Sequence, residues 1–153
     1  MNLRNFLTLT VRAVDFNLVA KQPDLVAKLR ELTIASYSGL NYELNRMLKD
    51  VEERSVNCKI LLAYRFKELV GWALLSKEDS DFHFSHEIPH FRGTDGWMFQ
   101  LFVNPKFRRQ GIGSELFKLA EKLIGGDPIC VSPWNDASSQ FYDNFPNSNQ
   151  RAL

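Results

Sequence analysis

Two apolar, β-compatible runs joined by a short polar segment constrain the fold of this chain most strongly. They span Cys58–Tyr64 and Leu69–Ser76, and Arg65–Glu68 joins them. Two runs of this composition at this spacing predict an antiparallel β-hairpin. The apolar stretches are far shorter than the ~20 residues that a membrane-spanning helix needs. The sequence therefore predicts a hairpin within a globular fold and no membrane span.

The patterns on either side of the hairpin predict further strands and helices. In chain order they are a strand at 6–14, helices at 23–39 and 41–51, the hairpin, a strand at 97–103, a helix at 111–124, a short strand at 128–132 and a short helix at 135–145. Residues 146–149 are typical of a turn. This order predicts an α/β (α+β) fold, in which a mixed sheet carries helices on its faces.

Size and charge limit the classes of function. The chain has 153 residues, a length that predicts a single domain spanning residues 1–153. Hydrophobic residues make up 44% of it, which is enough to form a core. Its net charge of +1 provides no overall field to attract nucleic acid or an anionic membrane. The first residues have no secretory signal pattern, so we expect a cytoplasmic protein. Cys58 and Cys130 have no CxxC or histidine partner, which favours buried free thiols.

The segment from Leu101 to Leu116 carries the clearest chemical pattern. A strand stops at Asn104-Pro105, a basic turn follows, and glycines open a helix. Gly111 and Gly113 have no side chain to cover the first N–H groups of that helix, so an anion can reach the positive end of its dipole. Lys106, Arg108 and Arg109 add positive charge. The pattern predicts a diphosphate site, or else a basic turn with glycines for tight helix packing.

Two motifs resemble those of a known family. Arg108–Gly113 is similar to the R/Q-x-x-G-x-G/A signature of the GNAT superfamily of N-acetyltransferases, and the preceding Leu-Phe-Val-Asn-Pro resembles its cofactor strand. Residues 131–142 resemble the second motif, in which Asn135 is followed seven positions later by Tyr142. The order of elements is also similar over most of the chain. The resemblance implies a mixed, mostly antiparallel sheet with helices on both faces, and acetyl-CoA as cosubstrate.

The resemblance also implies roles for individual residues. In that family the fourth and fifth strands splay apart, and the pantetheine arm pairs with the fourth strand, which here contains Leu101, Phe102 and Val103. The diphosphate would rest on the turn and first helical residues, namely Arg108, Arg109, Gln110, Gly111, Ile112, Gly113 and Ser114. Asn135 would hold the pantetheine or the strand splay, or else only cap a helix. Phe141 would pack near the thioester, or else belong to the core.

Catalytic roles follow from the same resemblance. Tyr142 matches the family's general acid, because a phenol can protonate the departing thiolate, although a tyrosine on an amphipathic helix is also common in a core. Trp97 stands where some members have a glutamate base. Asp95 is the first candidate to replace that base, ahead of His90 and Glu87 on the adjoining loop, unless Asp95-Gly96 is only a turn.

A second motif suggests different chemistry but fails on local structure. His86–His90 fits the letters of the zinc-protease motif HExxH. That motif needs both histidines on one face of a helix, and Pro89 removes an N–H and disfavours helical backbone at Ile88. We therefore expect no metal site, and solvated loop histidines instead.

Two functions of different class fit these patterns. The first is transfer of an acetyl group from acetyl-CoA to a primary amine on a small molecule, peptide or protein. The second is a catalytically inactive acyl-CoA-binding or protein-interaction module, suggested by the missing glutamate. Acidic residues on the loop before Trp97 favour a cationic amine as acceptor.

The carboxyl terminus departs from the family pattern. Phe145 is followed by Pro146 and a short tail instead of the usual Gly-Phe pair and strand hairpin. We expect that hairpin to be absent or reduced to one short strand. Such a sheet edge could be covered by a second copy of the chain, which predicts a homodimer.

Overall fold

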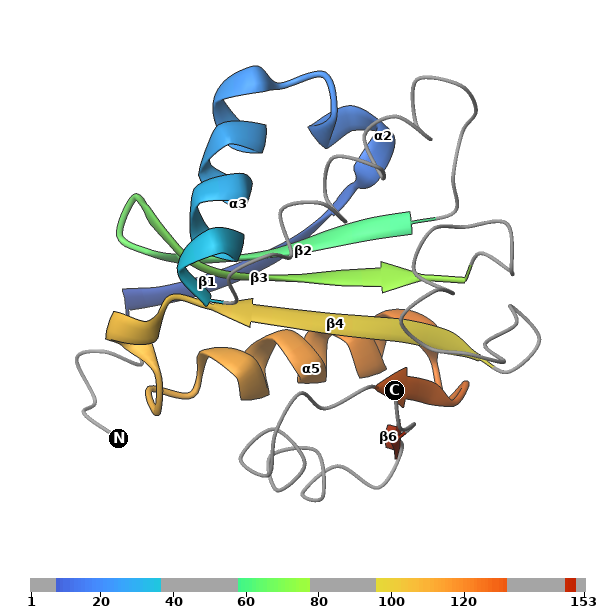
Figure 1. Ribbon diagram of the computed structural model, residues 1–153. Coiled ribbons are helices and arrows are strands. Elements are labelled where there is room, and N and C mark those ends of the chain that lie inside the picture. Colours follow the sequence, from blue (N-terminus) through green and yellow to red (C-terminus); the bar gives the residue numbers. More distant parts are fainter. Residues whose placement is uncertain (1–7, 37–57, 78–95, 132–147, 151–153) are drawn as a thin grey trace.

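The described residues form a six-stranded sheet with helices packed against it. A computed structural model describes residues 8–36, 58–77, 96–131 and 148–150 (Figure 1). The described elements are β1 (Leu9–Asp15), α2 (Phe16–Val19), α3 (Pro23–Ser36), β2 (Cys58–Arg65), β3 (Glu68–Ser76), β4 (Trp97–Val103), the 3-10 helix η3 (Pro105–Phe107), α5 (Ile112–Ile124), β5 (Ile129–Val131) and β6 (Ser148–Gln150). The described part contains no helix long and apolar enough to cross a membrane.

The strands lie in the order β1-β2-β3-β4-β5-β6. Strands β1 to β4 pair with one another in antiparallel order, whereas the β4–β5 and β5–β6 pairs are parallel. Parallel strands need a crossover, and η3 and α5 form the one between β4 and β5. The predicted mixed, mostly antiparallel sheet is confirmed.

Both faces of the sheet are covered, which explains why the hairpin sequence is apolar without interruption. Helices α2 and α3 lie on one face and α5 on the other (Figure 1). Along β2, Ile60 and Leu62 point to the α3 side, while Leu61 and Ala63 point to the α5 side. Successive side chains of a strand alternate between faces, so a doubly covered strand needs apolar residues at every position. The prediction of helices on both faces is confirmed.

A β-bulge in β3 brings α5 close to the sheet. The β2–β3 register shifts after Ala63, so that Val70 has no opposite residue and both Val70 and Gly71 lie on the α5 side. A Cβ atom on Gly71 would lie 2.8 Å from Cγ2 of Ile112, the first residue of α5. Gly71 therefore provides the space in which the start of the helix rests.

Most predicted boundaries differ little from the structure. The strand at 97–103 is confirmed as predicted, and the helix and strand that follow it begin one residue later than predicted. The first strand begins at Leu9 and continues to Asp15, and the turn α2 was not predicted. Cys58 is buried and forms no disulfide bond. The predicted helices at 41–51 and 135–145 lie outside the described residues.

Two predictions were wrong. Arg65 was placed in the hairpin turn, yet it is the last residue of β2 and is 9% exposed, because Phe66 and Lys67 alone form the turn. Ser148 and Asn149 were predicted as a turn but begin β6, which pairs with β5. Pairing with a neighbouring strand overrides the local preference of polar residues for a turn. The described carboxyl-terminal region contributes one short strand, as expected, and the predicted homodimer stays a prediction.

The close approach at Gly71 predicts the effect of adding one methyl group there. Gly71→Ala should lower the free energy of unfolding by about 1–3 kcal/mol, because the core at this point has no room for it. Urea denaturation measures the loss. In a Gly71→Ala/Ile112→Ala double variant the combined loss should be smaller than the sum of the single losses, since Ile112→Ala removes the atom that would clash. Strictly additive losses would contradict this contact.

Candidate diphosphate and cosubstrate site

The site begins at the β4–β5 pair. Within the described residues, which stop at Val131 on this side, Trp97–Phe99 pair with Ile129–Val131, and β4 continues to Val103. The paired end is held tightly: the Trp97 amide donates to Pro128 O at 2.9 Å, and a Cβ on Gly96 would lie 2.3 Å from the same oxygen. The β4–β5 pairing is thus fixed at one end of β4, and the other end leads into the basic turn.

An asparagine–proline pair turns the chain from β4 into η3. The Asn104 amide donates to Val70 O at 3.0 Å, which ties the strand end to the bulge in β3. The Asn104 side chain accepts from the Lys106 amide at 3.0 Å, and Pro105 occupies the first position of η3. An Asx cap and a proline at the first position are both typical of a helix start. These local interactions set the direction of the basic turn.

The amino end of α5 has no side-chain cap among the described residues. Gly111 precedes the helix with a left-handed φ of 81°. The first intrahelical bond runs from the Glu115 amide to Gly111 O at 3.1 Å, so the amides of Ile112 to Ser114 come before it. Arg109 also has a left-handed φ of 63°. Amides in such a turn at the positive end of a helix dipole form an anion site.

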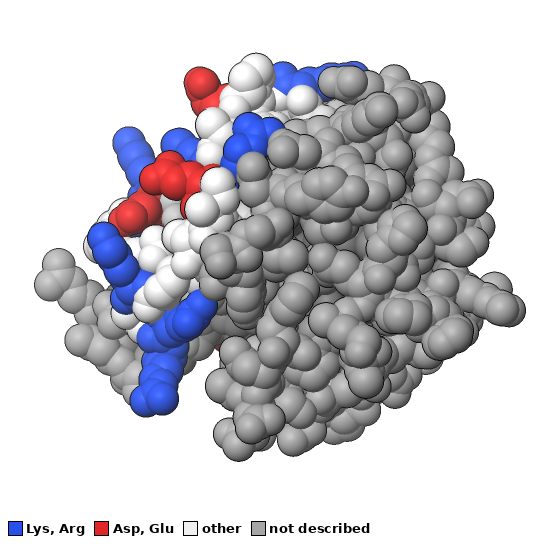
Figure 2. Space-filling view, viewed as in Figure 1, with Lys and Arg blue, Asp and Glu red and all other residues white. Residues whose placement is uncertain are grey.

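Positive side chains surround this open end. Lys106, Arg108 and Arg109 are exposed, and Lys and Arg side chains gather on the side of the molecule where η3 and the start of α5 lie (Figure 2). The first turn of α5 carries one acid, Glu115, whose carboxylate lies 3.6 Å from the Lys118 ammonium. The local field therefore favours an anion although the net charge of the chain is only +1.

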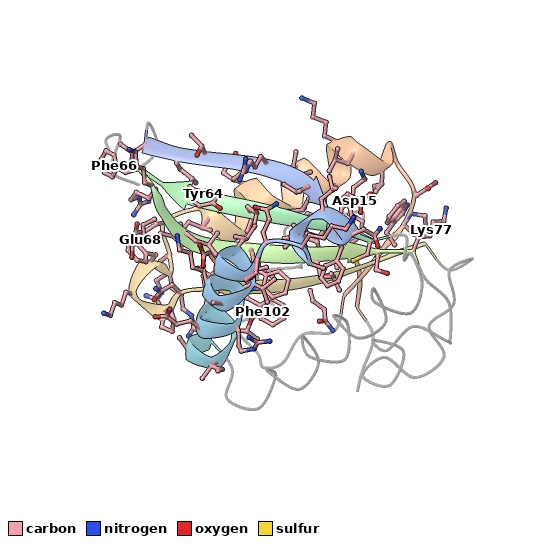
Figure 3. All side chains as sticks on the ribbon, turned by 90° about the horizontal axis from the view of Figure 1, so that it is seen from above. Asp15, Tyr64, Phe66, Glu68, Lys77 and Phe102 are labelled. Atoms are coloured by element: carbon pink, nitrogen blue, oxygen red, sulfur yellow. The ribbon has the colours of Figure 1, made fainter. Side chains whose placement is uncertain are left out.

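A buried arginine lies beneath the turn, and the sequence analysis missed it. The Arg65 Nη1 donates to Oε1 of Gln110, and its guanidinium lies 5.6 Å from the centre of the Phe107 ring. The period of two along β2 places Arg65 on the same face as Leu61 and Ala63, which is the α5 face. Extending the predicted strand by one residue, from Tyr64 to Arg65, would have placed Arg65 on this face. Figure 3 shows its chain neighbours Tyr64 and Phe66 at this end of the hairpin.

The predicted strand residues divide between backbone and core roles. Phe102 lies under α3 and stacks on Trp72 with ring centres 4.5 Å apart (Figure 3). Leu101 and Val103 are half-buried against the α5 side. Their side chains belong to the two cores, so only the backbone of these three residues could pair with a ligand.

The amino end of β4 differs in character. Trp97 is half-buried, its ring lies 5.6 Å from the Lys77 ammonium, and its buried indole nitrogen has no hydrogen-bond partner among the described residues. Lys77 in turn lies 3.6 Å from the Asp127 carboxylate. Position 97 therefore carries an indole, where some members of the family that the sequence resembles have a glutamate base.

Several predicted residues cannot be placed. Asp95, Asn135, Phe141 and Tyr142 lie outside the described residues, as do the three histidines and Glu87. Within the described ranges, no group of three or more His, Cys, Asp or Glu side chains could hold a metal ion. The structure thus brings together the predicted residues from Leu101 to Ser114.

Comparison with known proteins identifies the family. Residues 26–145 match the model of the acetyltransferase (GNAT) family. This chain belongs to that family. No curated protein sequence matches it significantly.

Solved GNAT structures have a similar fold. An aminoglycoside acetyltransferase from an uncultured soil metagenomic sample, in complex with sisomicin, has a TM-score of 0.64 at 13% identity over 97% of this chain and 94% of that one. "Histone acetyltransferase HPA2 and related acetyltransferase" from Corynebacterium glutamicum has a TM-score of 0.61 at 18% identity, over 90% of this chain and 83% of that one. Salmonella typhimurium yncA with its cofactor acetyl-CoA has a TM-score of 0.56 at 14% identity, over 91% of this chain and 79% of that one. At these identities the likeness concerns the fold.

The GNAT family uses acetyl-CoA as cosubstrate, and the described residues fit that molecule. Its diphosphate needs donors and positive charge, which the amides that open α5 and the basic turn can supply. Its pantetheine arm carries amides that can pair with a strand, and β4 leads directly into the same basic turn. The chemistry of the residues and that of the cosubstrate therefore agree.

The two glycines that flank α5 allow a matched test of this site. Gly111 and Gly125 both have left-handed φ values, at opposite ends of the helix. An alanine in this conformation costs about 1–2 kcal/mol, so both Gly111→Ala and Gly125→Ala should destabilise the fold by about that amount. Only Gly111→Ala should lower the affinity for coenzyme A, by about five- to thirtyfold, because the turn must regain the strained backbone shape when the ligand binds. Calorimetric titration measures the coenzyme A affinity of both variants. Equal effects of the two substitutions on that affinity would contradict the assignment.

Proposed function

We propose that this GNAT protein transfers the acetyl group of acetyl-CoA to a primary amine by direct attack of the amine. The observation that supports this most is the uncapped amino end of α5, with the left-handed Arg109 and Gly111 before it. An enzyme that holds a nucleotide-linked thioester needs such a site to bind its diphosphate. The thioester of acetyl-CoA supplies an activated acyl group.

In this proposal the described residues bind and orient the cosubstrate. The amides from Arg109 to Ser114 receive the diphosphate, and Arg108 adds charge next to them. The backbone of Leu101–Val103 pairs with the pantetheine arm, which directs the thioester along β4 toward its amino end. Asn135 and Phe141 would hold the pantetheine and the acyl end.

Two further residues move protons. Tyr142 donates a proton to the departing thiolate as negative charge develops on sulfur. A charged ammonium must lose a proton before it attacks, and we assign this step to Asp95, two positions before Trp97. Replacing Asp95 with Asn should then lower kcat and leave coenzyme A affinity unchanged.

The acceptor is a primary amine on a small molecule, peptide or protein. Acidic residues at 78, 79, 81, 87 and 95 precede β4, which favours a cationic acceptor. One structural relative has the aminoglycoside sisomicin bound, so polycationic amines belong among the first compounds to test.

An inactive acyl-CoA-binding module is the second candidate function. Trp97 favours it, because an indole cannot act as the base that a glutamate provides in some members. The Lys77 ammonium beside its ring would also repel a cationic acceptor. A module of this kind would bind coenzyme A and release none in response to amines.

A panel of amines separates the two functions. The purified protein is incubated with acetyl-CoA and with polyamines, aminoglycosides or peptides with free amino groups, while free thiol and product mass are followed. The enzyme should release coenzyme A at a rate that depends on one class of amine, and the product should gain the mass of one acetyl group. Binding of coenzyme A without amine-dependent thiol release would favour the module.

The role of Tyr142 predicts a change in turnover without a change in binding. Tyr142→Phe should lower kcat by about a hundredfold or more, since general acid catalysis contributes about that much, while the coenzyme A Kd stays within about twofold. Tyr64→Phe is the control: it removes the same hydroxyl from β2, where the ring packs against the α3 side. Equal kcat values for Tyr142→Phe and the wild type would exclude the catalytic role.

A further inference from the structure

Among the described residues, the buried positive charge of Arg65 has no negative partner. Arg65 is 9% exposed, its Nη1 donates to Gln110, and its Nε and Nη2 are buried without a hydrogen-bond partner in the part of the chain that the structure describes. No carboxylate within the described ranges forms an ion pair with it. Its register partner Glu68 is exposed on the other strand of the hairpin. The amide of Gln110 and the face of the Phe107 ring are neutral groups.

Such an arrangement is unfavourable in the ligand-free protein. A buried charge is normally paired, and a buried donor normally has an acceptor. A cation–π contact and one hydrogen bond to a neutral amide offset only part of the desolvation of a guanidinium. An apolar residue would suit this face of β2 better, as Leu61 and Ala63 do four and two positions earlier. The unmet need of Arg65 is for an anion.

The position of Arg65 shows where that anion would bind. Its two contacts, Phe107 and Gln110, lie on either side of Arg108 and Arg109. The guanidinium therefore contacts the basic turn from the side of the sheet. The amides of α5 follow where that turn ends. The β2–β3 hairpin, remote in sequence from the motif, thus reaches the same turn.

We propose that Arg65 is a positioning residue of the diphosphate site, which holds the turn through Gln110 and supplies a buried positive charge that the bound diphosphate neutralises. This inference rests on the proposed function and adds to it a residue outside the family motif. The buried guanidinium acts on the bound diphosphate through its contact with Gln110 and through space, because its Nε and Nη2 have no exposed surface. Burial also protects this charge from screening by salt.

The test compares coenzyme A affinity with the stability of the ligand-free protein. Arg65→Met keeps the length of the side chain and removes its charge. The coenzyme A Kd should rise at least about tenfold in calorimetric titration. The Tm without ligand should stay equal or rise, because an unpaired buried charge is removed. Arg12→Met is the matched control: Arg12 is exposed on β1 and lies over the Tyr64 ring, and its loss should change neither quantity.

Each other result has a defined meaning. Unchanged affinity in Arg65→Met overturns the inference alone, and loss of both Tm and affinity assigns Arg65 to the fold instead. If Arg65→Met does not fold, Gln110→Leu decides, because it removes the acceptor of Arg65 and should raise the Kd at least about threefold; an unchanged Kd then overturns the inference. Wild-type protein that gives no heat with coenzyme A would overturn the proposed function itself.

Discussion

The close packing of α5 on β3 at Gly71 determines where the amino end of the helix lies. Ile112 occupies the space that a side chain at position 71 would take, and the bulge at Val70 turns this part of β3 toward the helix. The same bulge accepts the hydrogen bond from Asn104, where β4 ends. One irregularity in the sheet therefore positions both ends of the basic turn. The open amides of α5 depend on a contact that lies outside the motif itself.

Burial on both faces makes the sheet a rigid support, and it also makes exceptions conspicuous. Trp72 and Phe102 stack on one side, and Phe99 meets Phe117 edge to face on the other. The Trp72 indole donates to the Thr33 hydroxyl at 3.1 Å, and that hydroxyl bonds Leu29 O at 2.7 Å, so this buried polar pair is satisfied. Arg65 is not satisfied in the same way. Among the described residues, Arg65 and the Trp97 indole are the side chains with buried polar atoms that lack a partner, and Arg65 alone of the two is charged. A local break of the packing rules of this kind points to function.

Much of this architecture could be predicted from the sequence, because strong periodic or continuous apolar patterns determine it. β4 and α5 have clear limits: Asn104-Pro105 ends the strand, and glycines flank the helix. The bulge at Val70, the burial of Arg65 and the role of Gly71 could not be predicted as directly, because each depends on which residue of another element lies opposite. β6 was missed because its three polar residues form a strand only by pairing with β5. The predicted roles of Asp95, Asn135, Phe141 and Tyr142 lie beyond the described residues and stay predictions.

The charges around the turn differ in how they respond to salt. Lys106, Arg108 and Arg109 are exposed, and counterions screen such charges over about 8 Å at physiological ionic strength. The amides of α5 and the guanidinium of Arg65 have fixed positions set by the sheet, and a buried charge is screened much less. The exposed residues would therefore mainly speed the encounter with an anionic cosubstrate, whereas the amides and Arg65 would hold it once bound. This division would let a chain of net charge +1 bind a polyanion at one local site without an overall positive field.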